Sequence, residues 1–206
     1  MLDLIIKNGQ CYINGELKNV DVSIKDGKIQ KIGQISEEAK EIIEAKGLTV
    51  LPGCIDTQTH FREPGSTDTE DLNSGSRAAV AGGITAVFEM PNTNPPTSTK
   101  KEFQRKLDLA KNRMYCNYAF YFGATADNAD ELADLKNLEG CCGIKLFAGS
   151  STGNLLVADE KDIETVFKNS SKVVAVHSED EAILKINKKS ISCFVVMCKT
   201  WAFLLY

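Results

Sequence analysis

The sequence predicts an α/β fold: a partial TIM (β/α) barrel of about five βα units, preceded by a small β-rich domain. Two observations predict it. The first part of the chain shows short strand-like runs separated by turns, whereas from about residue 50 near-continuous apolar runs alternate with helical patterns. Apolar runs of the second kind are typical of parallel strands that are buried on both faces.

The β-rich domain is expected over residues 1–52. Asn14-Gly15 is a hairpin signal. Residues 20–24 and 29–33 alternate apolar and polar side chains with the period of a strand, and residues 48–51 close the series. The pattern predicts an antiparallel sheet rather than a parallel one.

The barrel part is expected over residues 53–188. A closed barrel of eight strands needs about 250 residues, so only the first units are expected, as in a chain truncated at its C-terminal side. Such a sheet keeps an open edge and an exposed apolar face. The expected strands are residues 50–56, 84–90, 115–122, 143–147 and 173–177; the expected helices lie near residues 69–81, 99–112, 128–135, 160–169 and 179–188.

Residues 189–206 are interpreted as an aberrant apolar tail. Residues 191–206 contain the only Trp of the chain, almost no charge, and neither helix caps nor turn residues. The segment is short for a membrane-spanning helix, which needs about 20 residues, and Lys199 interrupts it. We favour an aberrant terminus that follows a truncation, with a core strand or helix and a membrane-associating tail as the alternatives.

Composition excludes several function classes. A net charge of −4 without a Lys/Arg cluster argues against nucleic-acid binding. The N-terminus lacks the basic segment and apolar core of a signal peptide, so export is not expected. The seven cysteines show no CxxC pair and are interpreted as buried, reduced thiols. Together these features predict a cytoplasmic protein that binds neither nucleic acid nor membranes.

Three ionisable residues stand where a parallel barrel places its chemistry. His60 and His177, the only histidines, follow expected strands at their C-terminal ends, and imidazole is a common zinc ligand. Lys145 lies inside an apolar strand, where an unpaired ammonium group is costly. The alternatives are structural histidines and a lysine whose ammonium group reaches solvent at the strand edge.

Three segments carry a family resemblance, and each lies at or just beyond the end of an expected strand. They are DTQTHFREPG at residues 56–65, MPNTNPPT at residues 90–97 and GIKLFAGSSTG at residues 143–153. Together they resemble dihydroorotases of the amidohydrolase superfamily. The resemblance implies the reversible cyclisation of N-carbamoyl-aspartate to dihydroorotate in pyrimidine biosynthesis. It also implies one or two Zn²⁺ ions that generate a hydroxide from bound water.

Carried over residue by residue, the resemblance implies His60, Lys145 and His177 as metal ligands. Lys145 would be carbamylated by CO₂, so that its carboxylate bridges two ions. Arg62 and Asn94 would hold the substrate carboxylate, for which an Arg fork is well suited.

The chain departs from the family pattern at two places. Gln58 replaces the first His of the family's His-x-His motif and is a poor zinc ligand. The catalytic Asp of the eighth strand has no counterpart, so no catalytic residue is assigned and the chain alone is expected to be inactive. Another cyclic amidohydrolase (an allantoinase or dihydropyrimidinase) and a non-catalytic homologue are the alternatives. Expected partners are the small-molecule substrate and either a second copy of the chain or aspartate transcarbamoylase.

Overall fold

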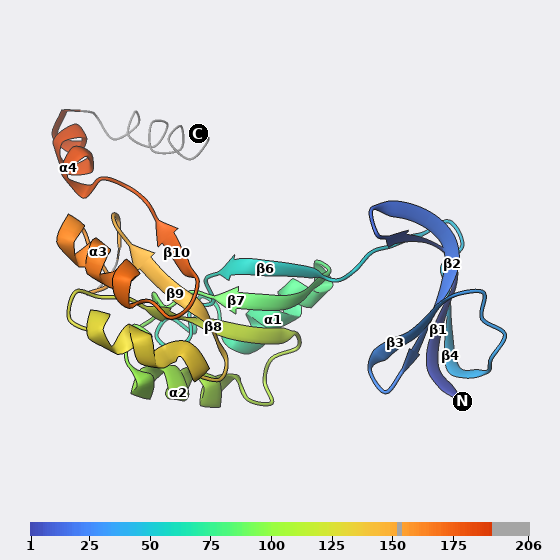
Figure 1. Ribbon diagram of the computed structural model, residues 1–206. Coiled ribbons are helices and arrows are strands. Elements are labelled where there is room, and N and C mark those ends of the chain that lie inside the picture. The colour runs from blue at the N-terminus through green and yellow to red at the C-terminus, as the bar shows by residue number, and fades with distance from the viewer. Residues whose placement is uncertain (152–153, 191–206) are drawn as a thin grey trace. The chain divides into compact units, whose positions relative to one another are not determined.

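The computed structural model describes residues 1–151 and 154–190, so the expected apolar tail after residue 190 lies outside the described residues. The chain divides into two compact units at Gly53 (Figure 1). Within the described ranges, no helix combines the length and apolar character needed to cross a membrane.

The first unit is a five-stranded sheet. Its strands are β1 (Leu2–Ile13), β2 (Glu16–Lys25), β3 (Lys28–Gly33), β4 (Ala39–Glu44) and β5 (Thr49–Val50). The order is β3-β2-β1-β4, with β5 also paired to β1. Asn14 and Gly15 both have positive φ in the turn between β1 and β2, as expected of this hairpin signal.

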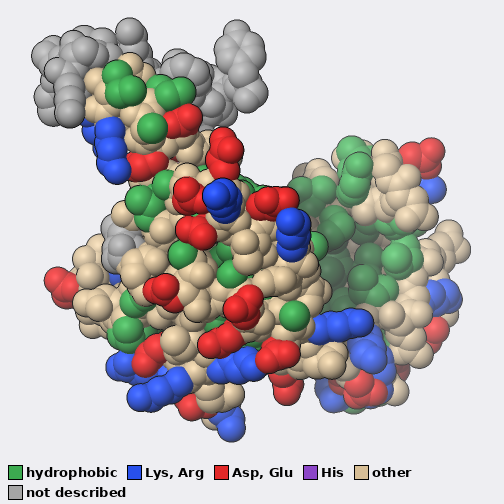
Figure 2. Space-filling model, turned by 60° about the vertical axis from the view of Figure 1, so that its left-hand side comes forward, with side chains coloured by type: hydrophobic (Ala, Val, Ile, Leu, Met, Phe, Trp, Pro, Cys, Tyr) green, Lys and Arg blue, Asp and Glu red, His purple; other side chains and the backbone are tan. Residues whose placement is uncertain are grey.

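The expectation of a purely antiparallel sheet was wrong. β1 pairs with β2, and β2 with β3, in antiparallel register, but β4 and β5 both run parallel to β1. Strand β4 was not predicted, because its sequence AKEIIE places two isoleucines side by side and lacks the period-two alternation of a strand. Hydrophobic side chains gather on an exposed face of this unit (Figure 2). The exposed large hydrophobic side chains of the unit as a whole include Ile29, Ile32, Ile42 and Ile43.

The second unit confirms the predicted partial barrel. Its five strands pair in parallel in the order β10-β9-β8-β7-β6, which is the order of the chain, and helices cover one face of the curled sheet (Figure 1). The strands are β6 (Cys54–Thr59), β7 (Ile84–Glu89), β8 (Asn117–Gly123), β9 (Cys141–Phe147) and β10 (Val174–His177). The helices are α1 (Leu72–Ala81), α2 (Lys100–Ala110), the 3₁₀ helix η1 (Ala129–Asn137), α3 (Glu160–Asn169) and α4 (Glu181–Ser190).

Two elements of this unit differ from expectation. β6 begins at Cys54 rather than at residue 50, since Pro52 has no N–H group to donate to a sheet. Residues 129–137 form a 3₁₀ helix rather than an α-helix. The preceding Asn128 provides no side-chain cap, because its Oδ1 accepts a hydrogen bond from the Thr125 N–H at 2.8 Å instead.

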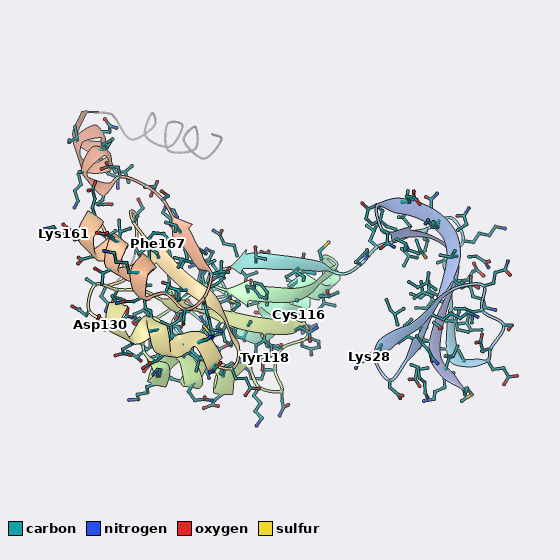
Figure 3. The ribbon with its side chains drawn as sticks, viewed as in Figure 1. Lys28, Cys116, Tyr118, Asp130, Lys161 and Phe167 are labelled. Atoms are coloured by element: carbon teal, nitrogen blue, oxygen red, sulfur yellow. The ribbon has the colours of Figure 1, made fainter. Side chains whose placement is uncertain are left out.

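The core of the second unit lies between the sheet and its helices. Phe103 of α2 is fully buried and packs against Phe120 and Phe122 of β8. Helices α3 and η1 are joined by a hydrogen bond that Asn169 of α3 donates to Asp130 of η1, a residue labelled in Figure 3. The five described cysteines are free thiols, as expected. Cys54 differs from the expectation of burial, because it is exposed.

Candidate active site

Two loops at the carboxyl ends of β6 and β7 form a pocket of about 320 Å³. Loops at this end of parallel strands are where barrel enzymes build their active sites. The first wall, after β6, contributes Arg62, Pro64 and Ser66; the second wall, after β7, contributes Asn92, Thr93, Asn94 and Pro96. The structure therefore places Arg62 and Asn94, the two predicted carboxylate-binding residues, in the lining of one pocket.

The two walls touch at Gly65. The Asn94 N–H donates to the Pro64 carbonyl at 2.9 Å. Gly65 has a φ of +125°, and a Cβ atom added there would lie 2.9 Å from Asn94 Cβ. Glycine is therefore required for both backbone conformation and close approach.

Replacing Gly65 by Ala should separate the walls and lower the free energy of unfolding by about 1–3 kcal/mol, since it adds backbone strain and a steric clash. Gly83→Ala is the matched control, because Gly83 also has a positive φ (+86°) but has open space around it. Chemical denaturation of both variants measures the difference. Equal losses would show that the contact with Asn94 contributes nothing.

His60 follows β6 and is half-buried beside the second wall. Its Nδ1–H donates to Asn92 Oδ1 at 2.8 Å, which leaves Nε2 with its lone pair. Burial is the main cause that lowers the pKa of His60. The hydrogen bond to Asn92 raises this pKa, and the nearby positive charges of Arg62 and Lys145 lower it. A neutral imidazole with one nitrogen fixed by a hydrogen bond is the form that binds metals.

Lys145 lies on β9, between β8 and β10, and is only 2% exposed. Lys145 therefore lies on an inner strand of the sheet, and most of its surface is covered. Its Nζ lies 5.0 Å from the ring centroid of Phe147, and no hydrogen bond or ion pair joins it to another residue in the described ranges. Burial lowers the pKa of Lys145, which favours the neutral, nucleophilic amine.

His177 ends β10 and is paired in register with Phe147 of β9. The two rings lie 6.0 Å apart, so Phe147 contacts both His177 and the Lys145 ammonium group. Nε2–H of His177 donates to Glu179 Oε2 at 2.7 Å, which leaves Nδ1 for another ligand. Gln58, on β6, is exposed.

The described residues do not assemble a metal cluster of unmodified side chains. No group of three or more His, Cys, Asp or Glu side chains comes together as a metal cluster within residues 1–151 and 154–190. The donors that fit are the two imidazoles, each with one nitrogen already fixed, and Lys145 once its amine carries a carboxylate.

Sequence reasoning missed several side chains that support the pocket. Asn92, which orients His60, lies inside the MPNTNPPT segment but was not singled out. Glu63, Glu89, Lys106 and Arg113 form two buried or partly buried charged pairs around the pocket walls. The only sequence signal for them was a charged residue within an apolar stretch of sequence, such as Glu89 at the end of the β7 strand ITAVFE.

Residues 49–189 match the model of the amidohydrolase family. The chain belongs to this family. It is 36% identical over 201 residues to a dihydroorotase from Methanosarcina mazei, covering 94% of this chain and 44% of that protein. It is 37% identical over 190 residues to an allantoinase from Escherichia coli, covering 88% and 42%. This amidohydrolase chain thus spans less than half the length of the relatives it matches.

Solved structures agree with the fold. An L-hydantoinase (dihydropyrimidinase) from Arthrobacter aurescens matches 92% of this chain and 44% of its own with a TM-score of 0.85 at 28% identity. A D-hydantoinase matches 92% and 43% with a TM-score of 0.75 at 30% identity. The amidohydrolase relatives therefore share a fold and a class but carry different substrate names.

Proposed function

We propose that this chain carries the first half of a cyclic amide hydrolase site whose ligands are dihydroorotate and N-carbamoyl-aspartate of pyrimidine biosynthesis. The observation that carries the proposal is the pocket in which Arg62 and Asn94 lie together beside the Asn92–His60 hydrogen bond. Both ligands carry a carboxylate that takes no part in the ring-opening or ring-closing reaction. A guanidinium fork and an amide N–H are suited to hold that carboxylate.

We infer that zinc would be held by His60, His177 and a carbamylated Lys145. Carbamylation joins Nζ of the neutral Lys145 amine to the carbon of CO₂ and releases one proton, so a neutral amine becomes an anion. The absence of a polar partner for Lys145 among the described residues and the lowered pKa support this modification. When bound, zinc supplies hydroxide at neutral pH.

The chain's own residues orient both the ligand and the metal-binding imidazole. Arg62 binds the carboxylate, and Asn94 donates to it from the opposite wall. Asn92 holds the proton of His60 on Nδ1, so that Nε2 stays available. These residues would therefore bind and orient the ligand.

Allantoin is the second candidate ligand, because the allantoinase relatives are as similar to this chain as the dihydroorotases. Hydantoins are a weaker candidate, since the structural neighbours named for them are 22–30% identical. A non-catalytic role in the cytoplasm, as a partner of aspartate transcarbamoylase or of a second copy of the chain, is a third possibility. Exposed Gln58 in place of a ligand favours that role.

The test combines zinc analysis, intact mass and ligand titration on one purified sample. We expect up to one zinc per chain, a mass increase of one CO₂ that Lys145→Met abolishes, and dihydroorotate binding at least about tenfold tighter than allantoin binding. Dihydroorotate turnover should stay absent, including in Gln58→His. Preference for allantoin would replace the proposed ligand, and a chain that binds neither ligand nor zinc would leave only the non-catalytic role.

A further inference from the structure

Helix α2 is tied to the second wall of the pocket by Lys106. The Lys106 side chain is fully buried, and its Nζ donates to the Met90 carbonyl at 2.9 Å and contacts the Glu89 carboxyl group. Met90 is the first residue of the segment that supplies Asn92 and Asn94. The Lys106 side chain of α2 therefore holds the backbone where the second wall begins.

The chain just beyond α2 is tied to the first wall by Arg113. Its two terminal nitrogens donate to the two carboxylate oxygens of Glu63, at 2.7 and 3.1 Å. Glu63 is 6% exposed and also accepts a hydrogen bond from the Leu72 N–H at the start of α1, at 3.0 Å. Because Glu63 stands between Arg62 and Pro64 in the chain, this pair fixes the backbone from which Arg62 reaches the pocket.

Apolar packing already docks α2, so neither charged residue is needed for that purpose. Phe103 is fully buried against Phe120 and Phe122. Burying charged groups costs desolvation energy, and apolar residues of similar size often stabilise a core as well or better. Beyond this apolar packing, Lys106 reaches the Met90 carbonyl and Arg113 reaches Glu63, while the Lys106 ammonium group also lies 5.1 Å from the Phe120 ring centroid.

We infer that α2 and the residues just after it act as a bracket that sets the relative position of the two pocket walls, with Lys106 and Arg113 as positioning residues for the ligand. The walls meet through the Asn94–Pro64 hydrogen bond, the His60–Asn92 hydrogen bond and the contact at Gly65. A small displacement of either wall would therefore change the separation of Arg62 and Asn94. The identity of the ligand rests on the proposed function; the bracket itself does not.

Arg113→Gln tests the bracket, with amide hydrogen exchange as the readout. Arg113 is partly exposed, so the variant should fold. We expect the Ser66 and Asn94 amides, which donate to the Arg62 and Pro64 carbonyls, to exchange at least about tenfold faster. Amides of the central strand β8 should keep their rates. Arg113→Lys, which keeps the charge but loses the two-pronged contact, should fall between.

Arg105→Gln is the matched control, because the exposed Arg105 lies on α2 and forms an ion pair with Glu102 of the same helix. In Arg113→Gln and Glu63→Gln, dihydroorotate affinity should fall together with the hydrogen-exchange protection of the Ser66 and Asn94 amides. In the control, both should stay unchanged. Unchanged exchange at Ser66 and Asn94, or acceleration spread equally over β8, would overturn the bracket. If the unmodified protein binds no dihydroorotate, the proposed function fails while the exchange measurement still decides the bracket.

Discussion

Replacing Lys106 by Met lowers the free energy of unfolding of the second unit by about 3–5 kcal/mol at pH 9, because a buried carboxylate is left without its cation. Glu89 and Lys106 are both fully buried. Within the described residues, the Glu89 oxygens have no hydrogen-bond partner to replace the ammonium group. The Met90 carbonyl also loses the hydrogen bond that Lys106 donates.

The pH dependence separates this cause from a simple packing defect. Burial raises the pKa of Glu89 to about 8 from its ordinary value near 4.5, although Lys106 opposes the shift. Glu89 therefore contributes stability that is fully present below about pH 4.5 and is lost as the pH rises through about 8. Removing Lys106 raises this pKa further, so the loss caused by Lys106→Met should be small at pH 5 and large at pH 9.

Urea unfolding followed by circular dichroism at both pH values measures the effect. Glu89→Gln combined with Lys106→Met should recover most of the loss at pH 9, since it removes the stranded charge. Lys168→Met is the control, because Lys168 makes an exposed ion pair with Glu164 and should change stability by less than about 0.5 kcal/mol. A Lys106→Met variant with the same loss at pH 5 and pH 9 would contradict the charge argument.

The order of barrel elements could be predicted from the sequence because local patterns specify it. Apolar runs such as residues 84–89 and 143–147 can satisfy their backbone only in a buried sheet, and helices follow each of them. Strand β4 escaped prediction because it is held by its parallel pairing with β1, a long-range contact that its own sequence does not signal. Strand β6 was misplaced because the preceding apolar run continued into a Pro-Gly turn.

The site was predictable only where a short segment contains the residues concerned. Arg62 and Asn94 lie in recognisable segments, and the structure brings them into one pocket. Glu63 and Arg113 are 50 residues apart in the chain, and each alone resembles an ordinary surface charge. Their pairing follows from how α2 packs on the sheet, which no local pattern encodes. The supporting contacts of a pocket are therefore harder to predict than the residues that line it.

Replacing Arg62 by Gln should weaken dihydroorotate binding about 100-fold, equivalent to about 2–3 kcal/mol, since a charge-assisted, two-pronged contact to the carboxylate is lost. Arg62 lines the pocket opposite Asn94, so no second cation of that pocket replaces it. Allantoin carries no carboxylate, and its affinity should change far less in the same variant. The measurement is calorimetric titration of both ligands.

Two further variants decide whether charge or geometry provides the affinity. Arg62→Lys keeps the charge but presents a single ammonium group, so its affinity should lie between those of the wild type and Arg62→Gln. Arg105→Gln removes one positive charge from the exposed side of α2 and should leave binding unchanged. If Arg62→Lys binds as tightly as the wild type, the pocket attracts an anion through charge alone, and its selectivity for a planar carboxylate has to come from Asn94 and the Gly65 contact that holds it in place.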